Sequence, residues 1–443
     1  AMLIDSTTRR NLELVQPMNS YNKKGALLSI LDQTKTPMGG RLFVNWLLFP
    51  LNSLKKIVLR HDAVEEMVGS KDLRDDVRDA LAKMGDLERM LSKFVTSRAN
   101  ARDAKAVQNT LEMASNLKDL LKNVSSDYWV RIRDDLSVLK SLVERINHAI
   151  VDNPPLSITD GGIIKRGFDA DLDALKDISF SGKDWIARLQ QSERERTGIP
   201  SLKVNFNKVF GYYIEVTKPN ISKVPAHYTR KQTLVNAERF ITQDLKEYEE
   251  KIVGAEEKMA SIEYEIFGEI RKLILAETQQ LQYNARLLAE ADCLASLANI
   301  AVENDYTRPH MNESDTVEIK DGRHPVVERL LPPGEQFVAN DVTIDNKNEQ
   351  LHIITGPNMA GKSTFLRQVG LIVIMAQMGG YVPARSASIG LIDRVFTRVG
   401  ASDNLAAGES TFLTEMNETA NILNNATEKS LILLDEIGRG TST

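Results

Sequence analysis

The sequence predicts a multidomain protein of mixed α and α/β class, in which a helical region with an inserted β-rich module precedes an α/β domain. Apolar residues recur at three- and four-residue steps over most of the first 300 positions. The period becomes strand-like between about 183 and 243, and short apolar runs with glycine turns begin near 308. At 443 residues the chain is too long for one ordinary core.

The first 150 residues indicate several helices. Thr36 suits an N-cap, and Pro37 follows at the first helical position, where its missing N–H would have no helical partner in any case. Apolar residues then recur at helical spacing over 54–68 and 77–94. The run 152–155, Asp-Asn-Pro-Pro, ends this region because consecutive prolines cannot extend a helix.

Residues 183–243 differ from the rest in both period and charge. Apolar and polar residues alternate over 202–206, residues 209–216 are β-rich, and Asn207-Lys208 suits the turn of a hairpin. This stretch holds eleven Lys and Arg against five Asp and Glu, an excess of +6 in a chain of net charge −5. Such asymmetry predicts an anion-binding module, and a solvated surface is the alternative.

Five basic residues of this module are the candidate phosphate contacts: Lys203, Lys208, Arg230, Lys231 and Arg239. No combination of side chains suited to reading base edges is visible. We therefore expect binding to a nucleic-acid backbone without sequence preference.

After position 243 the sequence indicates a long helix. Apolar residues from Leu245 to Leu273 follow a seam of threes and fours, and little interrupts the pattern until about Ile300. One helix of that span would be about 80 Å long at 1.5 Å per residue. Either a coiled-coil arm or a lever that joins the basic module to another domain fits this pattern.

The α/β region contains a glycine-rich phosphate-binding pattern. A predicted strand, 351–354, runs into G-x-x-x-x-G-K-[ST] at 356–363, and an apolar helix follows. The loop consists of Gly356, Pro357, Asn358, Met359, Ala360, Gly361, Lys362 and Ser363. Glycines allow backbone N–H groups to surround phosphate oxygens, Lys362 supplies a charge to the β- and γ-phosphates, and Ser363 offers a hydroxyl to Mg²⁺.

Two carboxylates complete this candidate site. The apolar run 431–434 ends in Asp435 and Glu436. Asp435 suits magnesium binding and Glu436 suits polarisation of an attacking water, so Glu436 and Lys362 are the catalytic candidates. Between the two motifs, the small-residue loop 408–412 is either structural or a donor to a partner's γ-phosphate.

Together these segments resemble the MutS family of DNA mismatch-repair ATPases. The longer matching segments are Thr355–Phe365, Asp393–Val399, Ser410–Met416 and Leu434–Thr443. The shorter ones are Thr36–Arg41, Glu195–Gly198, Gly211–Ile214, Asn236–Arg239 and Gly322–Pro325. The match covers nearly the whole chain and is closer to the bacterial members.

The resemblance implies a domain plan: a helical core and lever over 1–183 and 244–307, a DNA clamp over 184–243, and a partial, ABC-like P-loop ATPase domain over 308–443. It also implies that Phe337 stacks on adenine, that Asn358, Lys362, Ser363 and Thr364 line the phosphates and metal, and that Ser410 reaches the nucleotide of the opposite subunit.

The resemblance further implies ATP or ADP and Mg²⁺ as cofactors and mispaired duplex DNA as ligand. It implies a homodimer joined through the ATPase domains, downstream factors of the MutL type, and a bacterial cytoplasmic, nucleoid-associated location. The most apolar stretch, 369–378, is too short to span a membrane. The single cysteine, Cys293, lies in an apolar run and is expected to be buried, and His324 is expected to be structural.

The sequence departs from the family pattern at both ends. The mismatch-reading and connector domains do not precede the Ala1-Met2 start, and the chain stops at Thr443, soon after the second motif. We therefore expect a fragment of a longer protein, with weak or absent hydrolysis. Two alternatives stay open: a MutS-like ATPase acting on branched DNA in recombination, and a structural or dimerisation module without ATPase activity.

Overall fold

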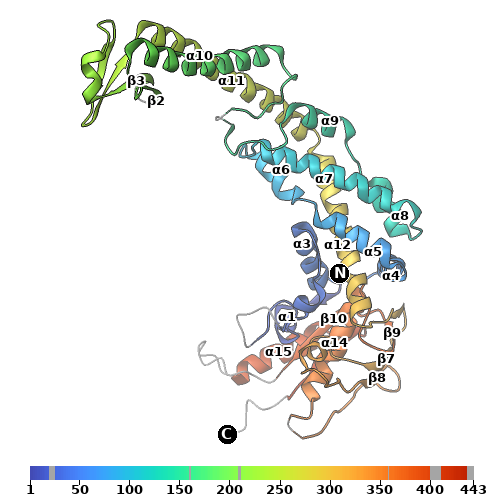
Figure 1. Cartoon of the computed structure of the whole chain (residues 1–443). Helices are drawn as coiled ribbons and strands as arrows, with labels where there is room; N and C mark the ends of the chain where they lie inside the picture. Colours follow the sequence, from blue (N-terminus) through green and yellow to red (C-terminus); the bar gives the residue numbers. More distant parts are fainter. Residues whose placement is uncertain (19–24, 159–160, 208–210, 358, 400–410, 437–443) are drawn as a thin grey trace. The chain divides into compact units, whose positions relative to one another are not determined.

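The computed structural model describes residues 1–18, 25–158, 161–207, 211–357, 359–399 and 411–436 (Figure 1). The chain divides into two compact units. The first comprises Ala1–Arg89, Asn109–Val138 and Gln279–Thr443, and the second comprises Met90–Gln108 and Leu139–Thr278. Each unit contains helices and strands, so the predicted mixed class is confirmed. The four-part division expected from the sequence stays a prediction.

The helices of the first unit follow the predicted periodicity. They are α1 (Ser6–Asn11), α2 (Leu27–Leu31), α3 (Pro37–Leu48), α4 (Leu54–Gly69), α5 (Lys71–Ala82), α8 (Asp127–Asp135), α12 (Thr278–Glu303, from Gln279 onward), α13 (Val327–Leu330), α14 (Lys362–Met378) and α15 (Thr411–Asn425). Helices α6 (Leu87–Val95) and α7 (Ala101–Leu120) have residues in both units. Thr36 caps α3 by accepting a hydrogen bond from the Gly39 N–H, as its sequence predicts.

Two sheets belong to the first unit. One is fully parallel, with the order β1 (Leu3–Ile4), β10 (Arg394–Arg398) and β11 (Ser430–Leu434). The other has the order β6 (His310–Asn312), β9 (Ser386–Gly390), β7 (Val317–Gly322) and β8 (Asn340–Ile344), with only the β6–β9 pair parallel. The α/β character expected from position 308 is thereby confirmed.

Strand β1 shows that the first residues of the chain belong to the parallel sheet. Leu3 pairs with Arg394 and Ile4 with Val395. The following helix, α1, is fixed to β10, because the Thr8 hydroxyl accepts a hydrogen bond from the Thr397 N–H at 3.1 Å. The sequence pattern indicates mostly helix over the first 150 residues and gives no sign of this strand.

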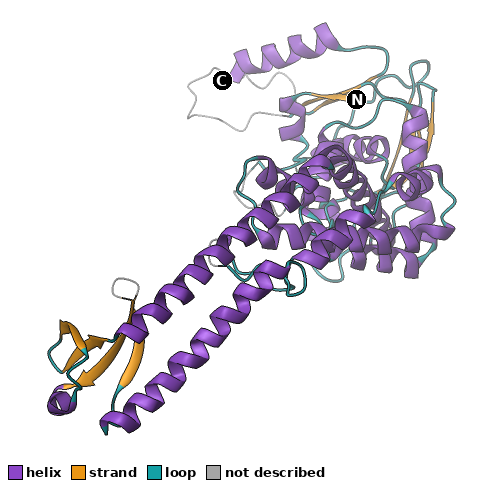
Figure 2. Ribbon diagram, turned by 90° about the horizontal axis from the view of Figure 1, so that it is seen from above, coloured by secondary structure: helices purple, strands orange, loops and turns teal. Residues whose placement is uncertain are grey.

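The second unit is built on two long helices and an antiparallel sheet. Helices α10 (Ala170–Thr197) and α11 (Gln243–Ala276) lie side by side, with the sheet at one end of the pair (Figure 2). The sheet order is β2 (Lys203–Asn207), β3 (Gly211–Thr217), β5 (Ala237–Ile241) and β4 (Thr229–Thr233). The short helix α9 (Lys140–Ala149) completes the unit's principal elements. Strands β2 and β3 are antiparallel, as the predicted hairpin requires.

An apolar cluster joins this sheet to the helix pair. Its buried members are Ile199, Leu202, Ile214, Val216, Tyr228, Phe240 and Leu245. Trp185 of α10 stacks on Tyr248 of α11 with ring centroids 3.7 Å apart and planes at 7°. The sheet is therefore packed onto the helices by one face, and its other face carries the residues of opposite parity along each strand.

The single helix expected from 243 to about 300 is wrong. Helix α11 ends at Ala276 and α12 begins at Thr278. At the break the Glu277 N–H bonds to Ile274 and Leu275, and the Thr278 hydroxyl donates to the Leu275 carbonyl at 2.6 Å. Satisfying these carbonyls locally ends one helix and allows the next to start, without a proline or glycine to mark the place.

The strand predicted at 351–354 is also wrong. These residues form no helix or strand and join neither sheet of the first unit, and Leu351 and Ile353 are 77% and 81% exposed. A cavity of about 640 Å³ is lined by Leu351, His352 and Ile354 together with residues of β11. A strand needs a neighbour to hydrogen-bond with, and apolar character alone does not supply one.

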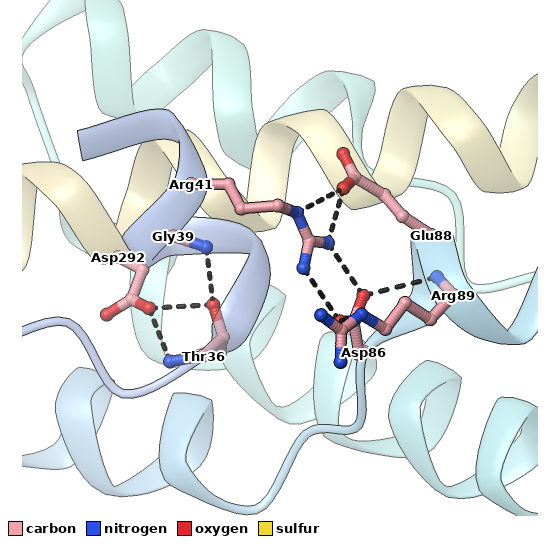
Figure 3. Close-up of polar contacts among 7 residues, drawn as sticks. All are labelled: Thr36, Gly39, Arg41, Asp86, Glu88, Arg89 and Asp292. Carbon is pink, nitrogen blue, oxygen red and sulfur yellow. Dashed lines mark hydrogen bonds and ion pairs between the residues drawn. The ribbon is translucent and has the colours of Figure 1, made fainter. Parts of the chain in front are cut away.

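A buried carboxylate ties α3 to α12 in the first unit (Figure 3). Asp292 of α12 is fully buried and accepts hydrogen bonds from the Lys35 and Thr36 N–H groups and from the Thr36 hydroxyl. Arg41, also on α3, forms ion pairs with Asp86 and Glu88. Cys293, next to Asp292, is buried as expected, and burial raises its pKa.

Candidate nucleotide site and basic sheet

The glycine-rich loop leads directly into α14. Gly361, which precedes the first helical residue, has φ +89°, and Met359 has φ +66°. This left-handed backbone suits glycine and is uncommon for methionine, so the loop holds a sharp local turn. The N-cap residue of α14 is Gly361, which has no side chain to cap the helix. A glycine N-cap supplies no oxygen that would compete with an anion for the first N–H groups of a helix.

Lys362 lies over the loop that precedes it. Its Nζ donates to the carbonyl oxygens of Gly356 and Pro357, at 2.7 and 3.1 Å. The ammonium group is therefore held against the backbone of this loop. Ser363 and Thr364 are half-buried on the first turn of α14, whereas Pro357 and Ala360 are exposed. Asn358 lies outside the described residues.

The second motif follows the parallel strand β11. Asp435 is 8% exposed, and its N–H donates to the Arg398 carbonyl at the end of β10, at 2.6 Å. Glu436 is exposed and has φ +54°. A non-glycine residue in this conformation stores backbone strain, which occurs most often at functional sites. Both carboxylates thus lie at the carboxyl end of the sheet, where ligands of parallel α/β sheets bind.

Helix α14 packs on β11. This packing connects the glycine-rich loop, which precedes α14, with Asp435 and Glu436, which follow β11. A Cβ atom on Gly370 would lie 2.7 Å from Leu433 Cδ1, so helix and strand approach closely at that glycine. Phe337, the expected adenine contact, is half-buried just before β8. Ser410 lies outside the described residues, so its expected role stays a prediction.

The other end of α14 is held by residues that the sequence gave no reason to select. Arg60 and His61 of α4 bond to carbonyl oxygens of Met378 and Ala376, and Gln377 bonds to Leu51 and Ile392. A positive charge at a helix C-terminus is favourable, but nothing in the local sequence of α4 indicates a distant helix end. The signal that could have found them is an Arg-His pair inside the apolar repeat of 54–68.

His324 is structural, as expected. It is 6% exposed, and its Nδ1 accepts from the N–H groups of Val326 and Val327 at 3.3 and 3.2 Å. Burial, followed by the positive charge of Arg367, lowers its pKa to about 4. Burial lowers the pKa of His61 to about 4 as well, with a further contribution from Arg308.

These two histidines predict acid sensitivity of the first unit. Between about pH 6.5 and pH 4 the unfolded chain takes up a proton on such a histidine and the folded chain does not. The free energy of unfolding is therefore highest above about pH 6.5 and decreases as pH falls towards 4. We expect His324→Gln to reduce the loss of unfolding free energy between pH 7 and pH 5 by about 1–2 kcal/mol. Urea unfolding at both pH values measures this; an equal loss in variant and parent would contradict it.

The candidate DNA contacts are unequally available. Lys203, Arg230 and Lys231 are exposed on the sheet of the second unit, whereas Lys208 lies outside the described residues. Arg230 pairs with Glu238 at 2.8 Å. Arg239 is occupied within the sheet: it pairs with Glu215 at 3.1 Å and lies 4.2 Å from the centroid of the Tyr213 ring. Arg239 therefore has partners within the sheet, and its contact with phosphate stays a prediction.

Comparison with known proteins identifies the family. Residues 7–298 match the family model for MutS domain III, and residues 352–443 match that for MutS domain V. The DNA mismatch repair protein MutS of Salinibacter ruber is 56% identical over 440 residues, which are 99% of this chain and 48% of that protein. Those of Acetivibrio thermocellus and Clostridium tetani are 52% and 51% identical, covering 100% and 99% of this chain and 51% and 50% of the relatives.

The fold is thus that of a multidomain protein with MutS domains III and V. The chain belongs to the MutS family, and the resemblance drawn from the motifs is confirmed. It spans about half the length of the curated relatives it matches. Among the described residues, no helix is both long enough and apolar enough to cross a membrane.

Proposed function

We propose that this chain is the central and ATPase portion of a DNA mismatch-repair protein. The observation that carries the proposal is the match to MutS domains III and V together with a glycine-rich loop that opens α14 beside β11. In the whole protein it would couple ATP binding and hydrolysis to a grip on mispaired duplex DNA. The expected homodimer, MutL-type factors and bacterial cytoplasmic, nucleoid-associated location belong to the same proposal.

The nucleotide would be held by the loop and the first turn of α14. Backbone N–H groups at the start of the helix and the charge of Lys362 suit the phosphates. Ser363 and Asp435 would hold Mg²⁺, which when bound neutralises charge on the phosphates and fits a hydroxyl and carboxylate donor set. Glu436 is exposed at the same sheet edge, where it would orient the attacking water.

The charge on Lys362 supplies the test of the nucleotide site. Lys362→Ala is expected to weaken ADP binding at least about a hundredfold, because the phosphates lose a charge-assisted contact of about 3 kcal/mol. Isothermal titration calorimetry on this chain measures it. Lys347→Ala, a change of the same kind outside the loop, is the matched control and should bind ADP as the parent does. Equal affinity in Lys362→Ala and parent would rule out this site.

The basic sheet of the second unit would grip the DNA backbone. Replacing Lys208, Arg230 and Lys231 together by Gln is expected to weaken binding of matched and mispaired duplexes alike. Each lost phosphate contact also removes about 0.9 from the slope of log K against log salt, so the slope should flatten by about two to three units.

Fluorescence anisotropy across salt concentrations measures both effects. A control triple variant, Lys55→Gln, Lys71→Gln and Lys83→Gln, removes the same charge from exposed positions of the first unit and should keep the parent slope. An unchanged slope in the sheet variant would mean that its basic residues form only a solvated surface. Tighter binding of mispaired than of matched duplex by the parent chain would contradict the expectation, because it would mean that residues 1–443 contain an element that recognises mismatches.

A further inference from the structure

Several buried hydrogen bonds within the first unit fix the C-terminal end of α14. Arg60 Nη1 donates to the Met378 carbonyl at 2.6 Å, and His61 Nε2 donates to the Ala376 carbonyl at 3.0 Å. Both side chains are buried, at 8% and 1% exposed. Two adjacent residues of α4 therefore satisfy two of the last carbonyls of the helix that begins at Lys362.

The surroundings of Arg60 are shaped to keep it in place. Its guanidinium lies 3.4 Å from the centroid of the Trp46 ring on α3. Gly379 has φ +101°, and a Cβ there would lie 2.5 Å from Arg60 Cδ. Any other residue at this position would therefore clash with the arginine side chain. The contact thus combines a cation, an aromatic face and a close backbone approach, rather than a surface ion pair.

A second anchor holds the same turn of α14. Gln377 is fully buried; its Nε2 donates to the Leu51 and Ile392 carbonyls, both at 2.8 Å, and its Oε1 accepts from the Ile392 N–H. Every residue of α14 from Gln368 to Met378 is buried. A helix is stiff along its axis, so fixing this end determines where its first turn and the glycine-rich loop lie.

From these contacts we infer that Arg60 is a positioning residue for nucleotide binding, which acts by holding the P-loop helix at its far end. The inference rests on the proposed nucleotide site at the other end of the helix. Phosphate binding by backbone N–H groups depends on geometry at the level of hydrogen-bond lengths. An α14 released from Arg60 samples positions in which those groups no longer converge, and this lowers the population of the binding-competent state.

The test compares ADP affinity in variants of this chain. Arg60→Met removes the grip on α14 and is expected to weaken ADP binding about threefold to thirtyfold, the range for residues that act without touching ligand. Arg60→Lys retains a donor and a charge and should recover most of the affinity. Arg74→Met is the matched control. Arg74 is also buried and donates to the Met67 carbonyl near the end of a helix, but this helix is α4 and not α14.

The outcomes separate a positioning role from a general loss of stability. The inference requires Arg60→Met to weaken ADP binding while Arg74→Met, with a comparable fall in melting temperature, does not. Equal weakening in both, or parent affinity in Arg60→Met, overturns it. If Arg60→Met does not fold, His61→Gln, which changes the contacts of His61 with the Ala376 and Gly380 backbone at the same helix end, is used in the same comparison. Loss of binding in Lys362→Ala with none in the Arg60 variants overturns this inference alone; no loss in Lys362→Ala overturns the proposed site.

Discussion

Replacing Glu436 by Gln is expected to lower ATP hydrolysis by about 10²–10⁴-fold, the usual contribution of a general base, while leaving ADP binding unchanged. The substitution keeps the size of the side chain and removes only the carboxylate that would orient water. It also keeps a non-glycine residue at φ +54°, so the local backbone strain is retained. Single-turnover hydrolysis in a full-length MutS protein that carries this segment is the measurement.

Glu428→Gln provides the control for this prediction. Glu428 is exposed just before β11, whereas Glu436 follows the other end of the same strand. Both variants lose one carboxylate, but only Glu436→Gln changes the edge of the sheet that carries Asp435. A fall of less than about tenfold in Glu436→Gln, or the same fall in Glu428→Gln, would assign the general base to another group.

Gly39→Ala is expected to lower the free energy of unfolding by about 3 kcal/mol, the upper part of the range for overpacked cores. A Cβ at this position would lie 2.2 Å from Asp292 Oδ2 (Figure 3). The carboxylate would have to move and so lose its hydrogen bonds from Lys35 and Thr36. Because Asp292 is fully buried, donors left without it would be unsatisfied in the core.

The neighbouring glycine supplies the control for that variant. A Cβ on Gly40 would come no closer than 3.4 Å to Thr34 Oγ1, which is an ordinary contact. Gly40→Ala should therefore be neutral or stabilise α3 by about 0.5–1 kcal/mol through its better helix propensity. Chemical unfolding of the two variants and the parent measures the difference. Equal stability of Gly39→Ala and Gly40→Ala would show that Asp292 adapts without loss.

Several features could be predicted because their cause is local in the chain. The cap at Thr36, the hairpin between β2 and β3, and the turn-and-helix context of Lys362 each follow from residues within a few positions of one another. The charge excess of 183–243 is likewise a property of composition. The family match followed from the same local blocks and was confirmed by comparison.

Other predictions failed because they depended on partners. The segment 351–354 has the composition of a buried strand, yet it forms no ladder with the strands described. The helical pattern expected to continue to about Ile300 gives no sign of the break at Glu277, because periodicity records which side chains are apolar and not which carbonyls find other donors. The DNA contact expected of Arg239 stays a prediction, and only the structure shows that this residue also pairs with Glu215 across the sheet.

By itself, then, the sequence determined the mixed fold class, the family and the loop that would bind nucleotide, because each can be recognised from patterns among residues that are close in the chain. Only the tertiary structure showed that Asp292 bonds to Thr36, 256 positions away, and that Arg60 holds Met378, 318 positions away. Hydrogen bonds between distant segments leave no periodic trace in either segment. Burial makes them strong, because a buried donor or acceptor that loses its partner has no water to replace it.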